Sequence, residues 1–90
     1  MTKQLVSLEE VKLYLRIDGN EEDELITSLI VLAQGYASDV LKYELTEELL
    51  MSPVKQALLI LCEHFYEERS GAEIPSVVYT LLRPYRKVGW

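Results

Sequence analysis

Residues 52–71 read SPVKQALLILCEHFYEERSG, and this stretch decides the fold of the chain. Ser52 is a favourable N-cap residue, Pro53 suits the first helical position and Gly71 is a natural stop, so the stretch predicts a helix. Residues 57–62 are apolar without interruption, so apolar side chains surround the helix instead of forming one stripe. Such a helix has to be covered on several sides. We therefore expect it to be the central core helix of a small soluble domain.

The chain has 90 residues, which corresponds to one domain, and its 49% of hydrophobic residues is typical of a folding chain and not of a disordered one. The net charge of −6 means that the surface as a whole repels nucleic acid and anionic lipid. The single cysteine, Cys62, cannot form an internal disulfide and indicates a reducing compartment. We expect no signal peptide, no segment long and apolar enough to span a bilayer, and synthesis in the cytoplasm.

A short helix is predicted near the N-terminus, from Ser7 to about Arg16. Ser7 and Glu10 have the spacing of a capping box, and Val6 can pack back as a hydrophobic staple. We interpret Glu9 and Glu10 as helix-start residues and not as a catalytic pair. The apolar residues of this segment fall on one side of the helix, namely Leu8, Val11, Leu15 and Tyr14.

The longest predicted helix runs from about Glu21 to Lys42, after a turn at residues 17–20. Its acidic start, residues 21–24, suits the positive end of the helix dipole. A docking face for a basic partner and a metal site are the alternatives, although the spacing does not match a calcium-binding loop. The short link to the core helix predicts antiparallel packing of the two long helices. Apolar residues recur at helical spacing, namely Leu25, Ile26, Leu29, Ile30, Ala33, Tyr36, Ala37, Val40 and Leu41.

Two residues on the opposite side of this helix, Val31 and Gly35, are candidates for a subunit contact. Val31 is apolar where the surface of a monomer should be polar. Gly35 costs about 1 kcal/mol relative to alanine inside a helix, which the close approach of another backbone would explain. Tolerated surface variation is the alternative.

The only cluster in the sequence that resembles a chemical site is His64 with Glu63, Glu67 and Glu68. His64 and the two later glutamates have the spacing of two metal ligands on one helix face, but no third ligand is visible. We interpret the cluster as a partly exposed histidine beside carboxylates. The chain has neither a glycine-rich phosphate loop nor a nucleophile with a credible base. We therefore predict a protein that is not an enzyme and holds no metal and no cofactor.

The C-terminal segment from Ala72 is predicted to be a short helix or an extended tail. Ser76 can cap a helix over residues 77–82 that ends at Pro84, although the run of valines also allows a strand. The charge then reverses to basic and aromatic residues, which dominate binding hot spots. They can bind nucleic acid, the acidic helices of their own chain or a neighbouring subunit, and the last fits best with an acidic body. These residues are Arg83, Tyr85, Arg86, Lys87 and Trp90.

Several motifs occur together in the order of a known protein family. They are residues 8–18 (LEEVKLYLRID), residues 22–26 (EDELI), residues 74–77 (IPSV) and residues 81–86 (LLRPYR). In this combination the chain resembles the small head-tail connector proteins of tailed bacteriophages and prophages. The resemblance covers nearly the whole chain, and it is the combination of the first motif with the closing motif that makes it specific. It implies an all-α fold, a compact bundle in which residues 1–90 form a single helical connector domain.

The resemblance also implies a structural role in the virion. Such proteins assemble as a ring under the portal protein after DNA packaging, extend the DNA channel, and offer a docking surface to the tail or a stopper protein. DNA would pass nearby without sequence-specific binding, and an acidic channel wall would keep it from sticking. Residues 72–90 would be a mobile assembly tail. As contacts within the ring or with the portal we expect Val31, Gly35, Arg83, Tyr85, Arg86 and Trp90.

Two other classes of protein are alternatives to this interpretation. A small acidic inhibitor or DNA mimic, which binds a nucleic-acid enzyme through carboxylates, would explain the net charge but not the basic tail. A helix-turn-helix DNA-binding protein would carry basic residues along one recognition helix, and neither long helix does so.

Overall fold

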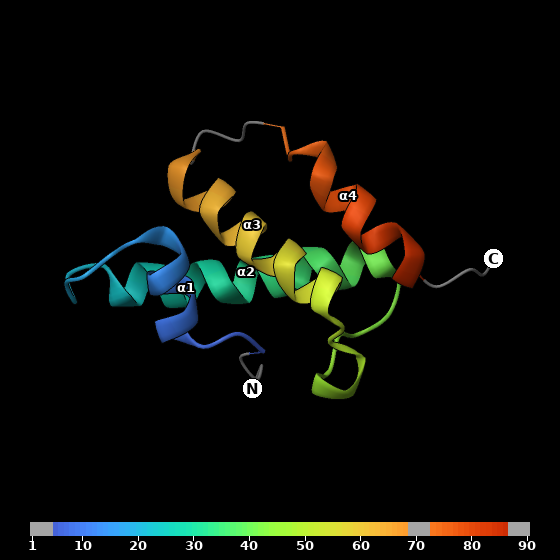
Figure 1. Cartoon of the computed structure of the whole chain (residues 1–90), viewed down its shortest axis with the longest axis horizontal. Helices are drawn as coiled ribbons and strands as arrows, with labels where there is room; N and C mark the ends of the chain where they lie inside the picture. Colours follow the sequence, from blue (N-terminus) through green and yellow to red (C-terminus); the bar gives the residue numbers. More distant parts are fainter. Residues whose placement is uncertain (1–4, 69–72, 87–90) are drawn as a thin grey trace.

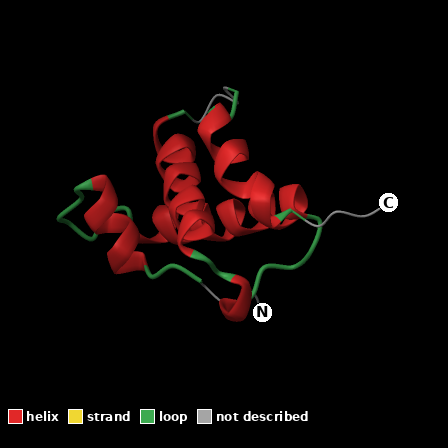
Figure 2. Ribbon diagram, turned by 45° about the vertical axis from the view of Figure 1, so that its right-hand side comes forward, coloured by secondary structure: helices red, strands yellow, loops and turns green. Residues whose placement is uncertain are grey.

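The computed structural model describes residues 5–68 and 73–86, and within these ranges the chain is helical with no strand. Four α-helices pack into an all-α bundle, which confirms the predicted fold class (Figures 1 and 2). The longest helix, α2 (Asp23–Leu41), forms the base, and α3 (Ser52–Glu67) runs back over it at an oblique angle (Figure 1). The two shorter helices, α1 (Leu8–Leu15) and α4 (Ser76–Leu82), complete the bundle.

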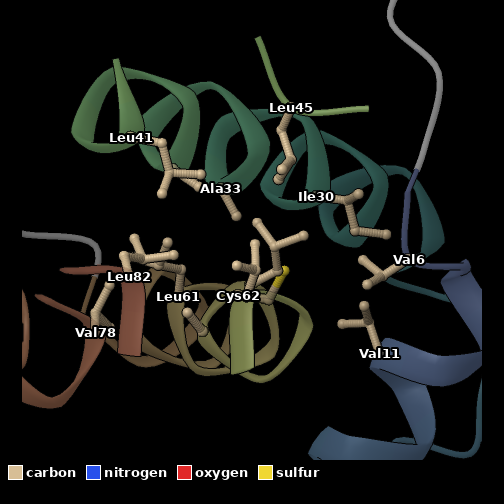
Figure 3. Packing of buried hydrophobic residues seen from close by; sticks show 14 of the residues in the cluster. Val6, Val11, Ile30, Ala33, Leu41, Leu45, Leu61, Cys62, Val78 and Leu82 are labelled. Atoms are coloured by element: carbon tan, nitrogen blue, oxygen red, sulfur yellow. The ribbon is translucent and has the colours of Figure 1, made fainter. Parts of the chain in front are cut away.

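The N-terminal helix α1 begins with the predicted capping box. The Ser7 hydroxyl accepts a hydrogen bond from the Glu10 N–H (3.0 Å), and the Glu10 carboxylate accepts one from the Ser7 N–H (3.1 Å). Val6 and Val11 are both buried on the same side of the bundle, as the hydrophobic staple requires (Figure 3). Arg16 ends the helix in the left-handed conformation (φ 61°). The Glu10 carboxylate also pairs with Lys55 of α3, and this bond lowers the pKa of Glu10.

Helix α2 starts at Asp23, two residues later than expected, because Glu22 has non-helical backbone angles. Asp23 and Glu24 lie in its first turn, as the dipole favours, and Asp23 pairs with Lys12 of α1 (2.8 Å). By length and composition alone α2 would qualify as a membrane span, so the expectation that no segment is apolar enough is wrong for this helix. The core helix of a soluble protein passes the same test, and one face of α2 lies in the core.

Helix α3 lies at the centre of the bundle and contacts α1, α2 and α4. Its first residue is Ser52 and its N-cap is Met51, so the predicted capping role of Ser52 is wrong. Pro53 is accommodated because the first four N–H groups of a helix have no partner within it. The helix ends at Glu67, before the predicted stop at Gly71, which lies outside the described residues. Phe65 is the last of its apolar residues that packs on the core.

The core lies between α2 and α3 and is closed by α1 and α4 (Figure 3). Helix α3 presents buried side chains toward several neighbours, as the uninterrupted apolar run predicts. The thiol of Cys62 is fully buried, and burial raises its pKa to about 12. The largest fully buried side chains are Ile26, Ile30, Leu41, Leu58, Leu61, Leu82, Val6, Val11, Val54, Val78 and Cys62.

The C-terminal segment is a helix and not a strand, so of the two alternatives for residues 77–82 the helix is confirmed. Ser76 is the first residue of α4 and makes no capping hydrogen bond, in contrast to the expectation, because Pro75 is the N-cap. Val78 and Leu82 lie four residues apart on the buried face. A 3-10 turn, η2 (Arg83–Tyr85), follows directly and contains Pro84. A second one, η1 (Glu47–Leu49), lies in the connection between α2 and α3.

Candidate subunit interface

An open groove of about 1250 Å³ runs along the outer side of α2. One wall is the second half of α2, and the other is the connection from Tyr43 to Glu48. Val31 and Gly35 both line this groove, so the structure brings the two predicted contact residues of α2 together. We call it the α2 groove, and its lining residues are Leu5, Val31, Gln34, Gly35, Ser38, Asp39, Lys42, Tyr43, Glu44, Leu45, Thr46, Glu47 and Glu48.

Two side chains of α2 fix the walls of the α2 groove. The Gln34 amide oxygen accepts a hydrogen bond of 2.6 Å from the Leu5 N–H, which holds the chain before α1 against α2. The Ser38 hydroxyl accepts one of 3.1 Å from the Leu45 N–H, which holds the connection after α2. Leu45 itself is buried in the core. The groove is therefore built from segments that are anchored independently of any partner.

The apolar end of the groove is exposed to solvent. Val31 is 41% exposed and its neighbour Leu32 is 52% exposed. A Cβ atom added at Gly35 would meet no atom of the described residues within 4 Å, so packing within this part of the chain does not require a glycine there. Packing within the described residues therefore does not explain why Val31 is apolar and residue 35 is a glycine. A contact with another subunit at this face of α2 would explain both.

The other end of the groove is acidic. Asp39, Glu44 and Glu48 make no ion pair with any residue of the described ranges, and all three are exposed. Lys42 is the single basic side chain among the lining residues, and its backbone ends α2 in the left-handed conformation (φ 70°). Exposed carboxylates without a cationic partner can bind the basic groups of another molecule through charge-assisted hydrogen bonds.

The predicted basic segment forms a turn at the end of α4. Arg83 and Arg86 are exposed, and within the described part of the chain neither makes an ion pair. Tyr85 is half-buried and packs against the core, and its carbonyl oxygen accepts a hydrogen bond of 2.8 Å from the Tyr43 hydroxyl. We call residues 83–86 the basic turn. Trp90, the last predicted contact residue, lies outside the described residues.

Tyr43 joins the two surfaces, because it lines the α2 groove and also holds the basic turn. Arg83 and Arg86 are not among the residues that line the groove. The two predicted contact surfaces are therefore linked through Tyr43 on one subunit. The arginines of the basic turn do not enter the α2 groove of their own subunit.

The sequence reasoning missed two exposed leucines. Leu13 of α1 is 82% exposed and Leu32 of α2 is 52% exposed. The same signal that singled out Val31 was present for Leu13, which is an apolar residue on the polar side of a predicted helix. Leu32 follows Val31 in the sequence, and the side chains of both residues are exposed on α2, although only Val31 lines the groove.

The remaining candidate residues take structural roles. Of the acidic run, Asp23 pairs with Lys12, and Glu22 accepts a hydrogen bond of 2.5 Å from the Tyr66 hydroxyl. The His64 ring packs edge-on against the neighbouring Phe65, with 5.6 Å between the ring centroids. Across residues 5–68 and 73–86 no three His, Cys, Asp or Glu side chains are grouped as a metal site would need.

The chain was compared with models of known protein families. A family model described as phage gp6-like head-tail connector protein matches residues 5–86, which is nearly the whole chain. The match includes all four motifs on which the resemblance was based, and it spans both the α2 groove and the basic turn. No curated protein and no solved structure matches the chain significantly.

Proposed function

Because this chain belongs to the family of phage gp6-like head-tail connector proteins, we propose that it assembles as a ring under the portal protein after the genome has been packaged. The ring extends the DNA channel and provides the surface on which the tail or a stopper protein docks. The protein is then a structural component of the virion without catalytic activity. It is made in the cytoplasm of the bacterial host and reaches its place at the head-tail interface by assembly.

The observation that carries this proposal is the family match over residues 5–86. The match covers every helix in the described part of the chain.

The surface properties support a ring of identical subunits. A closed ring is built from heterologous contacts, so each subunit needs two different faces that fit each other. The α2 groove and the basic turn are two such faces, with opposite charge and on different elements. Val31, Gly35, Arg83, Tyr85 and Arg86 are therefore proposed as contact residues within the ring or with the portal, and Trp90 stays a prediction.

The net charge supports a channel through which DNA passes. The chain carries 15 acidic and 9 basic residues. Nonspecific binding to DNA grows with the number of phosphates that basic groups neutralise, so an acidic wall repels the duplex and does not retain it. We propose that the subunits present acidic residues to the lumen of the ring.

Deletion of the gene from the phage or prophage that encodes the chain tests the proposal. We expect heads filled with DNA that lack tails, together with free tails, because the connector joins the two after packaging. Expression of the wild-type chain from a plasmid should restore infectious particles. Normal infectious particles from the deletion would contradict the proposal, and if the chain then inhibited a nucleic-acid enzyme, the acidic inhibitor would be the better interpretation.

A further inference from the structure

We infer that the basic turn of one subunit docks in the α2 groove of the next subunit, so that the two surfaces are each other's partners. This inference rests on the proposed function, because it needs the chain to associate with copies of itself. It specifies what the family membership leaves open, namely which segment of one subunit meets which segment of its neighbour.

Charge complementarity is the first argument. Three exposed carboxylates without an ion-pair partner among the described residues, those of Asp39, Glu44 and Glu48, stand at the acidic end of the groove. The basic turn offers Arg83 and Arg86, which are exposed and equally without such a partner. The planar guanidinium group of arginine binds carboxylates through two parallel hydrogen bonds, which gives direction as well as affinity.

The apolar end of the groove fits the rest of the basic turn. Pro84 is exposed between the two arginines, and the methylene groups of arginine cover apolar surface while the charged end reaches a polar partner. The exposed Val31 and the open space above Gly35 provide such apolar surface within the same groove. One segment can therefore satisfy both ends of the groove at once.

Both surfaces are held in place before association. The walls of the groove are fixed by Gln34 and Ser38, and the basic turn is fixed by the hydrogen bond from Tyr43 to Tyr85. The arginines of the turn form no ion pair with the carboxylates of their own groove. The cost of ordering flexible segments on binding is thus small on both sides. The contact is heterologous, so repetition of it leads to a ring when the rotation closes.

Two charge-reversed variants test the contact in solution. In the groove variant Asp39→Lys is combined with Glu44→Lys, and in the turn variant Arg83→Glu is combined with Arg86→Glu. Each variant alone should lose self-association, measured by light scattering at low salt, because its groove and its turn then carry the same sign of charge. An equal mixture of the two should regain it, since the reversed groove accepts the reversed turn and the native groove accepts the native turn.

A control variant matched to the groove variant carries Asp18→Lys and Glu67→Lys, which raise the net charge by as much as Asp39→Lys with Glu44→Lys does, at exposed positions outside the groove. It should associate like the wild type. Circular dichroism should show the same helix content for all variants. Loss of association in the control, or a mixture that stays monomeric while the wild type associates, would overturn the inference.

Disulfide cross-linking separates this inference from the proposed function. A Glu44→Cys variant and an Arg86→Cys variant are mixed and oxidised, while the native Cys62 stays buried and unreactive. We expect cross-links between the two different variants and few between identical ones. If the wild-type chain forms a ring but this pair does not cross-link, the inference fails and the connector role stands. If the chain associates neither with itself nor with the portal, the connector role fails as well.

Discussion

The Tyr43 hydroxyl donates a hydrogen bond of 2.8 Å to the backbone carbonyl oxygen of Tyr85, which joins the end of α2 to the turn after α4 across 42 residues of sequence. The bond holds the backbone of Tyr85, which lies in the basic turn directly before Arg86. It also ties the wall of the α2 groove to the basic turn of the same subunit.

Replacement of this tyrosine, Tyr43→Phe, should lower the free energy of unfolding by about 1 kcal/mol, the usual net value of one hydrogen bond. Hydrogen exchange of the Arg86 amide, which donates to the Arg83 carbonyl oxygen (3.2 Å), should become faster. The control is Tyr66→Phe, which removes a tyrosine hydrogen bond to Glu22 at the other end of the molecule. Faster exchange at Arg86 in the control as well would contradict a local role for Tyr43.

Gly35 separates the stability of the subunit from its assembly. Because a Cβ atom at this position meets no atom of residues 5–68 and 73–86 within 4 Å, Gly35→Ala should stabilise the isolated chain by about 0.5–1 kcal/mol through helix propensity. The same methyl group should weaken self-association, since it fills space that the neighbouring subunit uses. Urea unfolding and light scattering measure the two effects. A variant that is more stable and associates as well as the wild type would show that no partner approaches Gly35.

The buried face of α3 should dominate stability. Leu61→Ala is expected to lower the free energy of unfolding by about 2–5 kcal/mol, because Leu61 is fully buried between helices and its removal leaves a cavity. The matched control is Leu13→Ala, the same chemical change at a residue that is 82% exposed, and it should change stability by no more than about 0.5 kcal/mol. Similar losses for both variants, measured by urea unfolding, would contradict the position of α3 at the centre.

Alkaline pH should destabilise the fold through Cys62. Burial raises the pKa of the thiol from 9.0 to about 12, so the folded chain keeps a proton that the unfolded chain releases. The contribution is complete below pH 9 and is lost as the pH rises toward 12. Between about pH 8.5 and 9.8, roughly the range below tyrosine ionisation, Cys62→Ala should show a flatter decline of stability than the wild type. Equal slopes in urea unfolding under reducing conditions would contradict this.

Tyrosine ionisation would extend this decline to higher pH. Burial, followed by the hydrogen bond with Tyr79, raises the pKa of Tyr36 from 10.0 to about 12. The contribution of Tyr36 to stability is therefore lost as the pH rises from 10.0 to about 12. The Cys62→Ala variant is compared with the wild type at lower pH so that this loss does not mask the effect of the thiol.

Local patterns in the sequence were sufficient to predict where the four helices lie along the chain. The capping box of Ser7 and Glu10 is decided by residues three positions apart, and the helical spacing of α2 identified both its core face and the exposed Val31. The same logic misplaced the start of α3 by one residue. The reason is that Pro53 is tolerated at more than one position of a first helical turn, so the pattern did not fix the N-cap.

The candidate interface depended on contacts between distant segments. Helical spacing placed Val31 and Gly35 on one face, but the second wall of the groove is a connection whose position depends on the bond between Leu45 and Ser38. The link between Tyr43 and Tyr85 joins residues that no local pattern pairs. Charge alone had suggested that the basic segment meets an acidic surface, and only the packed helices show which carboxylates are without an ion pair among the described residues.

The most direct test of the connector role is the solution mass of the chain, measured by light scattering over a range of concentrations with the portal protein of the same phage absent and then present. We expect a closed ring of subunits, or a monomer that joins the portal as a ring, with the association weakened at high salt because charged contacts are screened. A chain that stays monomeric at every concentration and does not bind the portal would contradict the proposed function.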